Sequence, residues 1–177
     1  MEIKGKTIGI RAFQIEDIAP FYAAAIESIE HMQQFMPWCH PEYSIQETEA
    51  WVLSRIEAWN NASEYSFIIY SIETNELLGG VDINQINSNH NIVNIGFWIR
   101  NKALNKGVAT DAVALITSFG FGQLRLNRLE IVTLPNNKAC RKVAEKAGAK
   151  YEGILQSRLV VHGEILDACM YSLVKNV

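Results

Sequence analysis

The chain has 177 residues, of which 49% are hydrophobic and 20% charged, and its formal net charge is −3 at pH 7. These values are ordinary for one globular domain, so we expect a single domain over residues 1–177. The chain has no basic stripe for binding nucleic acid, and no apolar run approaches the roughly eighteen residues of a membrane span. Three cysteines without C-x-x-C spacing and an N-terminus without an apolar leader lead us to expect a cytoplasmic protein.

The first half of the chain predicts an opening strand, two helices and a strand pair. Alternating apolar residues favour a strand over Thr7–Phe13, and apolar residues at helical spacing favour a helix from Asp17 to Met32. Ser44–Asn60 predicts a second helix, because it begins with the capping-box pattern Ser-Ile-Gln-Glu. Glu64–Glu73 and Glu76–Ile86 predict an antiparallel pair with a tight turn between them.

The middle of the chain predicts an anion-binding turn. An apolar strand from Asn91 to Arg100 leads into a polar turn, and an amphipathic helix follows from about Lys106 to Gln123. A glycine-bearing turn at a helix start leaves main-chain N–H groups unpaired at the positive end of the helix dipole, which suits a phosphate or pyrophosphate. The turn has one glycine, so it is not the G-x-G-x-x-G turn of dinucleotide folds, and the chain contains no P-loop string.

A second strand and helix follow this turn. Arg128–Leu134 predicts a strand that ends at Pro135, and a short helix is expected over Asn136–Gly148, with a polar N-cap and a C-terminal cap at Gly148. A last hairpin is expected over Leu159–Asp167, with its turn at His162-Gly163. Strands that first meander and then alternate with helices indicate the α+β class rather than a doubly wound sheet.

The two strand–turn–helix stretches resemble, in order and spacing, the GNAT acetyltransferase superfamily. Leu104–Ala109 is similar to the acyl-CoA pyrophosphate loop Q/R-x-x-G-x-G/A, with Leu104 in place of Gln or Arg. Asn137–Gly148 is similar to the pattern N-x-x-S-x-x-[VL]-x-E-K-x-G, with Cys140 in place of Ser. Together with the C-terminal hairpin, they most resemble the RimJ/RimL branch of ribosomal-protein N-terminal acetyltransferases. The resemblance implies a mixed, mostly antiparallel central sheet with a splayed strand pair, flanked by helices.

The resemblance also implies an activity and its partners. It implies transfer of an acetyl group from acetyl-CoA, without a metal, to a primary amine, preferably the N-terminal α-amine of a protein such as a ribosomal protein. It allows a homodimer. The N–H of Trp98 or Ile99 is expected to polarise the thioester carbonyl, and Asn137 to contact the pantetheine arm. Arg141 or Lys142 is expected to reach the 3′-phosphate. The full set of expected cofactor-binding residues is Trp98, Ile99, Arg100, Asn105, Lys106, Gly107, Val108, Ala109, Thr110, Asn137 and Arg141.

Two residues are candidates for proton transfer. Cys140, at the position of the family's Ser, is the candidate acid for the leaving thiolate, and its alternative is a small residue that only packs. Asp82 is the candidate base, because an aspartate inside a strand is unusual, and its alternative is an exposed sheet residue. Met36, Trp38 and Asn84 are the expected acceptor pocket, although Met36 and Trp38 are equally well explained as anchors of their loop.

Two other functions stay open from the sequence. The acceptor can be a small amine, such as a polyamine, an amino acid or an aminoglycoside. The chain can also be a CoA-binding module without turnover, because Leu104 and Cys140 stand where the family has polar residues.

Overall fold

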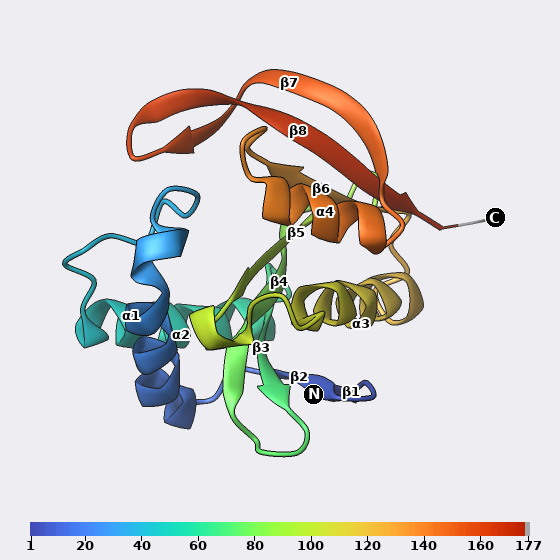
Figure 1. Cartoon of the computed structure of the whole chain (residues 1–177). Helices are drawn as coiled ribbons and strands as arrows, with labels where there is room; N and C mark the ends of the chain where they lie inside the picture. Colours follow the sequence, from blue (N-terminus) through green and yellow to red (C-terminus); the bar gives the residue numbers. More distant parts are fainter. Residues whose placement is uncertain (176–177) are drawn as a thin grey trace.

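A computed structural model describes residues 1–175. These residues form an eight-stranded sheet with helices on both faces (Figure 1). Within them, no helix has the length and apolarity needed to cross a bilayer. In chain order the elements are β1 (Glu2–Lys4), β2 (Ile8–Ala12), η1 (Ile15–Asp17), α1 (Ile18–Met32), α2 (Ile45–Asn60), β3 (Tyr65–Ser71), β4 (Leu77–Asn87), β5 (Ile92–Ile99), η2 (Asn101–Ala103), α3 (Val108–Gly122), β6 (Arg128–Thr133), α4 (Lys138–Lys146), β7 (Lys150–Val161) and β8 (Glu164–Val174).

The strand order is β1-β2-β3-β4-β5-β6-β8-β7. Every neighbouring pair is antiparallel except β5 and β6, which are parallel. The parallel pair is joined by the crossover through α3, as parallel strands require. The expected α+β class, with a mixed and mostly antiparallel sheet, is therefore confirmed.

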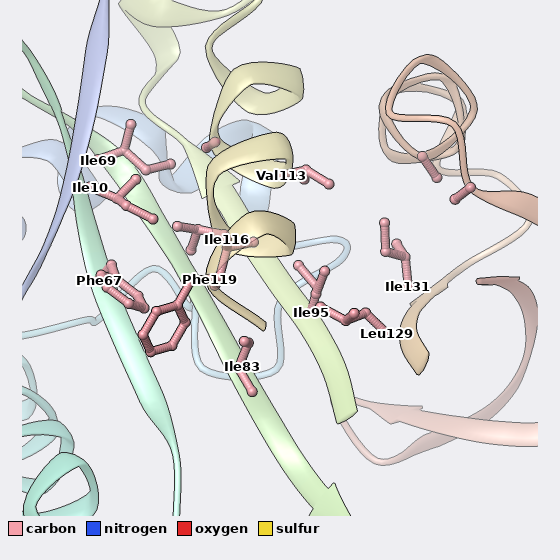
Figure 2. Packing of buried hydrophobic residues seen from close by; sticks show 14 of the residues in the cluster. Ile10, Phe67, Ile69, Ile83, Ile95, Val113, Ile116, Phe119, Leu129 and Ile131 are labelled. Carbon is pink, nitrogen blue, oxygen red and sulfur yellow. The ribbon is translucent and has the colours of Figure 1, made fainter. Parts of the chain in front are cut away.

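The two faces of the sheet carry different cores. Helices α3 and α4 cover one face, where aliphatic residues of α3 pack against inward-facing residues of β2 to β6 (Figure 2). Helices α1 and α2 cover the other face, whose core is rich in aromatic rings. Strand alternation divides the residues between the faces: Phe67 and Ile69 lie on the α3 side, and Ile68 and Tyr70 lie on the α1/α2 side.

The starts of α1 and α2 differ in how they are capped. The capping box expected at Ser44 is present: the Ser44 hydroxyl accepts from the Glu47 N–H, and the Glu47 carboxylate accepts from the Ser44 N–H. Asp17, where the sequence predicted this helix to begin, is the N-cap residue of α1, but its side chain makes no capping hydrogen bond. The carboxylate of Asp17 instead makes a two-pronged ion pair with Arg11 of β2, at 2.6 and 2.7 Å, and the residue is 3% exposed. For the buried Asp17 carboxylate, pairing with the Arg11 guanidinium outweighs capping, because an unpaired charge at that depth is costly.

The β7–β8 hairpin is much longer than the sequence indicated, although its turn lies at His162-Gly163 as expected. It arches from α4 to the end of α1 (Figure 1). At its tip the His162 Nε2 atom lies 2.6 Å from the Gln33 carbonyl oxygen at the end of α1. Closer to its base, Arg158 donates to the Gln85 side-chain oxygen of β4 at 3.2 Å. The hairpin is therefore held over the α1/α2 side of the sheet at two points.

Candidate active site

The parallel strands β5 and β6 part along their length. They pair only at their starts, where Ile92–Asn94 lies against Arg128–Glu130. Beyond this point β5 stays paired with β4 as far as Ile99, and β6 stays paired with β8 as far as Thr133. Within residues 1–175, the facing edges of β5 and β6 therefore have no strand partner from Ile95 and Ile131 onward, which is the splayed pair that the resemblance implied.

The turn before α3 has the backbone shape of an anion cradle. Gly107 is the N-cap of α3 with φ of +83°, and Asn105 also has a positive φ, of +60°. Asn tolerates this region better than most residues, so the turn keeps its shape without a second glycine. Within the described chain, none of the main-chain N–H groups of residues 105–110 donates to a protein acceptor. These groups are therefore available to an anion at the positive end of α3.

The space beside Gly107 is open to solvent. A Cβ built at Gly107 meets no heavy atom within 4 Å, and residues 105–107 are exposed. Leu104, which replaces the family's Gln or Arg, turns the other way and packs against the core on the α3 side. The cradle therefore depends on main-chain groups rather than on a side chain of residue 104.

The ladder between β4 and β5 decides which β5 amides face the gap. The Arg100 N–H donates to the Leu78 carbonyl at 2.8 Å, in the same register as the pairing of Gly80 with Trp98. Alternate residues of an antiparallel strand direct their N–H groups to the same neighbour. The Trp98 N–H therefore faces β4, and the Ile99 N–H faces the open edge. Of the two donors expected for the thioester carbonyl, the register favours Ile99.

The side chain of Arg100 is used within the fold. Its Nε donates to Glu27 of α1 at 2.8 Å, and its NH1 donates to Glu76 at 2.9 Å. The Glu27 carboxylate also accepts from the Lys102 N–H at 3.2 Å. Arg100 therefore ties the end of β5 and the start of the turn to α1, and only its main chain borders the gap.

Helix α4 begins beside the other wall of the gap. The Asn137 side-chain oxygen caps α4 by accepting from the Cys140 N–H at 3.0 Å, which leaves the amide NH₂ as its free donor. Arg141 donates to the Tyr171 hydroxyl at 3.1 Å and to the Pro135 carbonyl at 3.2 Å. Its guanidinium is thus held against β8, and contact with a cofactor phosphate stays a prediction.

The thiol of Cys140 is a proton carrier rather than a thiolate. Cys140 lies in the first turn of α4 and packs partly against the core. Burial raises the pKa of the thiol to about 11, and the neighbouring Thr133 side chain opposes this only in part. The group is therefore protonated at neutral pH. It can donate an S–H hydrogen bond, but it is poorly suited to act as a covalent nucleophile.

Asp82 lies on the α1/α2 face at the point where the strands part. It pairs with Gly96 of β5, and a Cβ at Gly96 would lie 2.8 and 2.9 Å from the two carboxylate oxygens. The carboxylate thus extends over β5, two residues beyond its last pairing with β6. Asp82 is partly accessible to solvent. Its pKa is raised to about 7, mainly by burial and then by the Glu64 charge, against an opposing hydrogen bond from Asn84.

Asn94 and Asn84 extend the polar group around Asp82. The Asn94 amide donates to the Asn84 side-chain oxygen at 3.0 Å, and Asn84 donates to Asp82. The Asn94 side-chain oxygen is buried and has no hydrogen-bond partner within the described residues. A buried acceptor without a partner is costly, and a bound N–H donor beside Asp82 would satisfy it. Asn84, expected in the acceptor pocket, lies within this polar group.

The two loop residues expected in the acceptor pocket lie on the same face, further from β6. Trp38 and Met36 both pack against the aromatic core of that face. Trp38 also lines a cavity between α1 and α2, and its ring centroid is 6.0 Å from that of Trp98 on β5. Trp98 therefore connects the loop to the strand that carries Gly96.

Sequence reasoning missed Asn94 and Gly96. The signal that would have found them is local: Asn94 and Gly96 lie two residues apart in a strand that is otherwise apolar. Residues two apart in a strand lie on the same face, so this spacing places the polar side chain of Asn94 beside the position of Gly96, which has no side chain.

Comparison with known proteins agrees with this geometry. The family model described as "Acetyltransferase (GNAT) domain" matches residues 7–150. The chain belongs to the GNAT acetyltransferase family. The RimJ/RimL type and the acetyltransferase activity expected from the sequence are thereby confirmed, and the match includes both the turn before α3 and the start of α4.

Three relatives of this GNAT acetyltransferase span nearly its whole length. The "Probable N-acetyltransferase YjcK" of Bacillus subtilis (strain 168) is 28% identical over 163 residues, covering 91% of this chain and 90% of the relative. The structure of a candidate ribosomal-protein-serine acetyltransferase from Vibrio cholerae has a TM-score of 0.88 and 26% identity, covering 99% of this chain and 98% of that one.

The third relative is RimL, the ribosomal L7/L12 alpha-N-protein acetyltransferase, in complex with coenzyme A through a disulfide with one of its cysteines. It has a TM-score of 0.88 and 19% identity, and covers 96% of this GNAT acetyltransferase and 95% of RimL. At this identity the likeness establishes the fold. Binding of coenzyme A is thus a property of a structural relative.

Proposed function

We propose that this GNAT acetyltransferase transfers the acetyl group of acetyl-CoA to the N-terminal α-amine of a protein, such as a ribosomal protein. One arrangement carries the proposal. The unpartnered amides before α3 and the open edge of β5 lie on one side, and the Asp82 carboxylate extends over the same strand from the α1/α2 side. Donor and acceptor would thus meet across β5.

The chain's own groups are suited to hold the thioester. When bound, acetyl-CoA supplies an acetyl group activated as a thioester. The N–H groups of residues 105–110 would hold its pyrophosphate, and the amide NH₂ of Asn137 would donate to the pantetheine arm. The Ile99 N–H would stabilise negative charge that develops on the carbonyl oxygen, because it lies on the open edge of β5. Of the two N–H groups expected to polarise the carbonyl, those of Trp98 and Ile99, we thus propose the second.

The acidity of Asp82 favours an α-amine over a lysine side chain. An α-ammonium has a pKa of about 7.7–8.0 and a lysine about 10.4. With Asp82 at about 7, moving a proton from an α-ammonium to the carboxylate costs about 1 kcal/mol. The same transfer from lysine costs about 4.6 kcal/mol, so the free amine of a lysine is about 250- to 500-fold less populated than that of an α-amine. The Asn94 oxygen would accept a second N–H of the amine.

Cys140 would assist departure of the coenzyme A sulfur. As the amine nitrogen bonds to the carbonyl carbon, the carbon–sulfur bond breaks and negative charge gathers on sulfur. The protonated Cys140 thiol would donate a hydrogen bond to that sulfur. Its pKa of about 11 lies above that of an ordinary thiol at about 8.5, so full proton transfer would be uphill. We therefore assign Cys140 hydrogen-bond donation. The bonded nitrogen would lose its extra proton to solvent to become the neutral amide, and the departing thiolate would take a proton from Asp82 or from solvent.

The test is a comparison of acceptors at equal concentration. Purified protein, acetyl-CoA and one acceptor are incubated, thiol release is followed, and mass spectrometry locates the acetyl group. The acceptors are a peptide with a free N-terminus and no lysine, the same peptide with a blocked N-terminus and one lysine, a polyamine and an aminoglycoside. We expect turnover with the free N-terminus and a rate at least a hundredfold lower with the blocked lysine peptide.

Each alternative has its own outcome. Faster turnover with the polyamine or the aminoglycoside would replace the protein acceptor by a small amine. Binding of acetyl-CoA in a thermal-shift assay without turnover on any acceptor would support a CoA-binding module. A ribosomal acceptor is then sought by incubating ribosomal proteins with labelled acetyl-CoA and sequencing the modified N-termini.

A further inference from the structure

A cavity of about 360 Å³ lies between α1, the loop that follows it and α2. None of its residues belongs to the cradle or to the polar group around Asp82. Its lining residues are Phe21, Pro37, Trp38, His40, Tyr43, Glu47 and Trp51.

Aromatic rings form the cavity's walls. Phe21 and Trp51 stack with centroids 5.0 Å apart and planes at 24°, which makes one wall. Trp38 and Tyr43, with centroids 5.4 Å apart, make the other. Phe21 is 1% exposed, and its ring centroid also lies 6.2 Å from that of Trp38, so Phe21 closes the deep end of the cavity. The interior is apolar, and its ring faces are electron-rich.

One carboxylate lies at the mouth of this cavity. Glu47 is exposed, and hydrogen bonds from the Ser44 hydroxyl and from His40 lower its pKa, so it is ionised at neutral pH. Its Oε1 lies 2.8 Å from the His40 Nε2. Of the seven described lining residues, none is lysine or arginine. The cavity thus combines an apolar interior with a negative rim.

The cavity lies within the length of one or two further residues of an extended peptide whose α-amine is at Asp82. Trp98 lies two positions beyond Gly96 on β5, a rise of about 7 Å. The Trp98 ring is 6.0 Å from Trp38 on the cavity wall. An extended peptide advances about 3.3–3.6 Å per residue. A peptide whose α-amine meets Asp82 can therefore place the side chain of its second or third residue in this cavity.

Resting on the proposed function, we propose that this cavity selects acceptors with arginine or lysine at the second or third residue. Both side chains have an apolar stem and a charged head. The stem would lie between the ring walls, and the head would reach Glu47 at the mouth. An apolar side chain would fill the interior but gain no attraction from the carboxylate, and an acidic one would be repelled by it.

The test uses acceptor peptides that differ only in the side chain at one position. Four peptides share a free N-terminus and carry arginine, citrulline, phenylalanine or glutamate at the second residue, and a parallel set varies the third. Citrulline has the shape of arginine without its charge. In one set, we expect kcat/KM for arginine to exceed that for citrulline by about three- to tenfold, the size of a cation–π contact with a partly exposed ion pair. Glutamate should give the lowest value.

The decisive variant is Glu47→Gln. Glutamine still completes the capping box with Ser44, so the start of α2 is kept while the charge is removed. The arginine-to-citrulline ratio should fall to about one, with citrulline turnover and the melting temperature nearly unchanged. Glu49→Gln is the matched control, because Glu49 is exposed on the same helix and does not line the cavity; it should leave the ratio as in the wild type.

The outcomes separate this inference from the proposed function. Equal turnover of arginine and citrulline in both sets, or preference for phenylalanine, would overturn the inference and leave N-terminal acetylation standing. An equal fall of the arginine-to-citrulline ratio in Glu47→Gln and Glu49→Gln would also overturn the inference. The preference would then come from the overall negative charge of the surface rather than from the cavity. Failure to acetylate any peptide would overturn both.

Discussion

Replacing Asp82 by Asn should make the protein more stable and less active. The carboxyl has a pKa of about 7 in the folded chain against an ordinary value of 3.8. A raised folded-state pKa contributes stability that is fully present below pH 3.8 and is lost as the pH rises to about 7. Asparagine has the same shape, can still accept from Asn84 and carries no charge to desolvate. The wild type alone therefore loses this stability.

The size of the effect follows from the shift. Each pKa unit corresponds to about 1.36 kcal/mol, so the full loss between pH 3.8 and 7 is at most about 4 kcal/mol. Between pH 5 and pH 8 the shift covers about two units. The stability advantage of Asp82→Asn should thus grow by about 2–3 kcal/mol over that range and stay constant above it. Because Asp82 is partly accessible, we expect the lower end.

Urea denaturation at pH 5, 6, 7 and 8 measures this advantage. Glu57→Gln, at an exposed position of α2, is the control and should show no such growth. In parallel, kcat with an α-amine peptide should fall about a hundredfold or more in Asp82→Asn, the usual size of a lost general base. An advantage that is the same at pH 5 and pH 8 would refute the raised pKa, and unchanged turnover would remove Asp82 from the reaction.

Three further predictions concern the cradle, the thiol and the core ion pair. Gly107→Val should raise the Kd for acetyl-CoA at least tenfold by calorimetry, because a branched residue at φ of +83° strains the turn and fills the open cradle; an unchanged Kd would count against the loop. Cys140→Ala should lower kcat about tenfold and keep that Kd, and full turnover would make Cys140 a packing residue. Asp17→Asn should cost about 2–3 kcal/mol in urea denaturation, below the usual 3–5 because Arg11 is partly exposed; a loss under about 1 kcal/mol would contradict the pair's role.

The cradle could be predicted because it is encoded locally. Asn105 and Gly107 permit the left-handed backbone, and the apolar strand and amphipathic helix on either side fix where the turn lies. The Ser44 capping box and the Gly148 cap, with φ of +84°, were recognisable for the same reason. Each feature depends on a few consecutive residues, so the local sequence indicates its conformation without knowledge of tertiary contacts.

The environment of Asp82 could not be predicted, because it is assembled from distant parts of the chain. Gly96 comes from β5, Glu64 from the residue before β3 and Arg55 from α2, and their combined effect sets the acidity of the carboxyl. Likewise Asp17 had the position of a helix cap, and only the folded sheet brings Arg11 to it.

The length of β7 was missed for a different reason. Its backbone is irregular near Gly153 and between Leu155 and Leu159, so the two-residue alternation that marks a strand is lost. Most of its residues are also exposed, because it is an edge strand.

The two fastenings of the β7–β8 hairpin restrict what can reach β5 from the side of α1 and α2. One joins His162 to Gln33, and the other joins Arg158 to Gln85, so α1, β4 and the hairpin enclose the approach. Each fastening is a single hydrogen bond worth about 1 kcal/mol, so brief detachment of the hairpin is cheap.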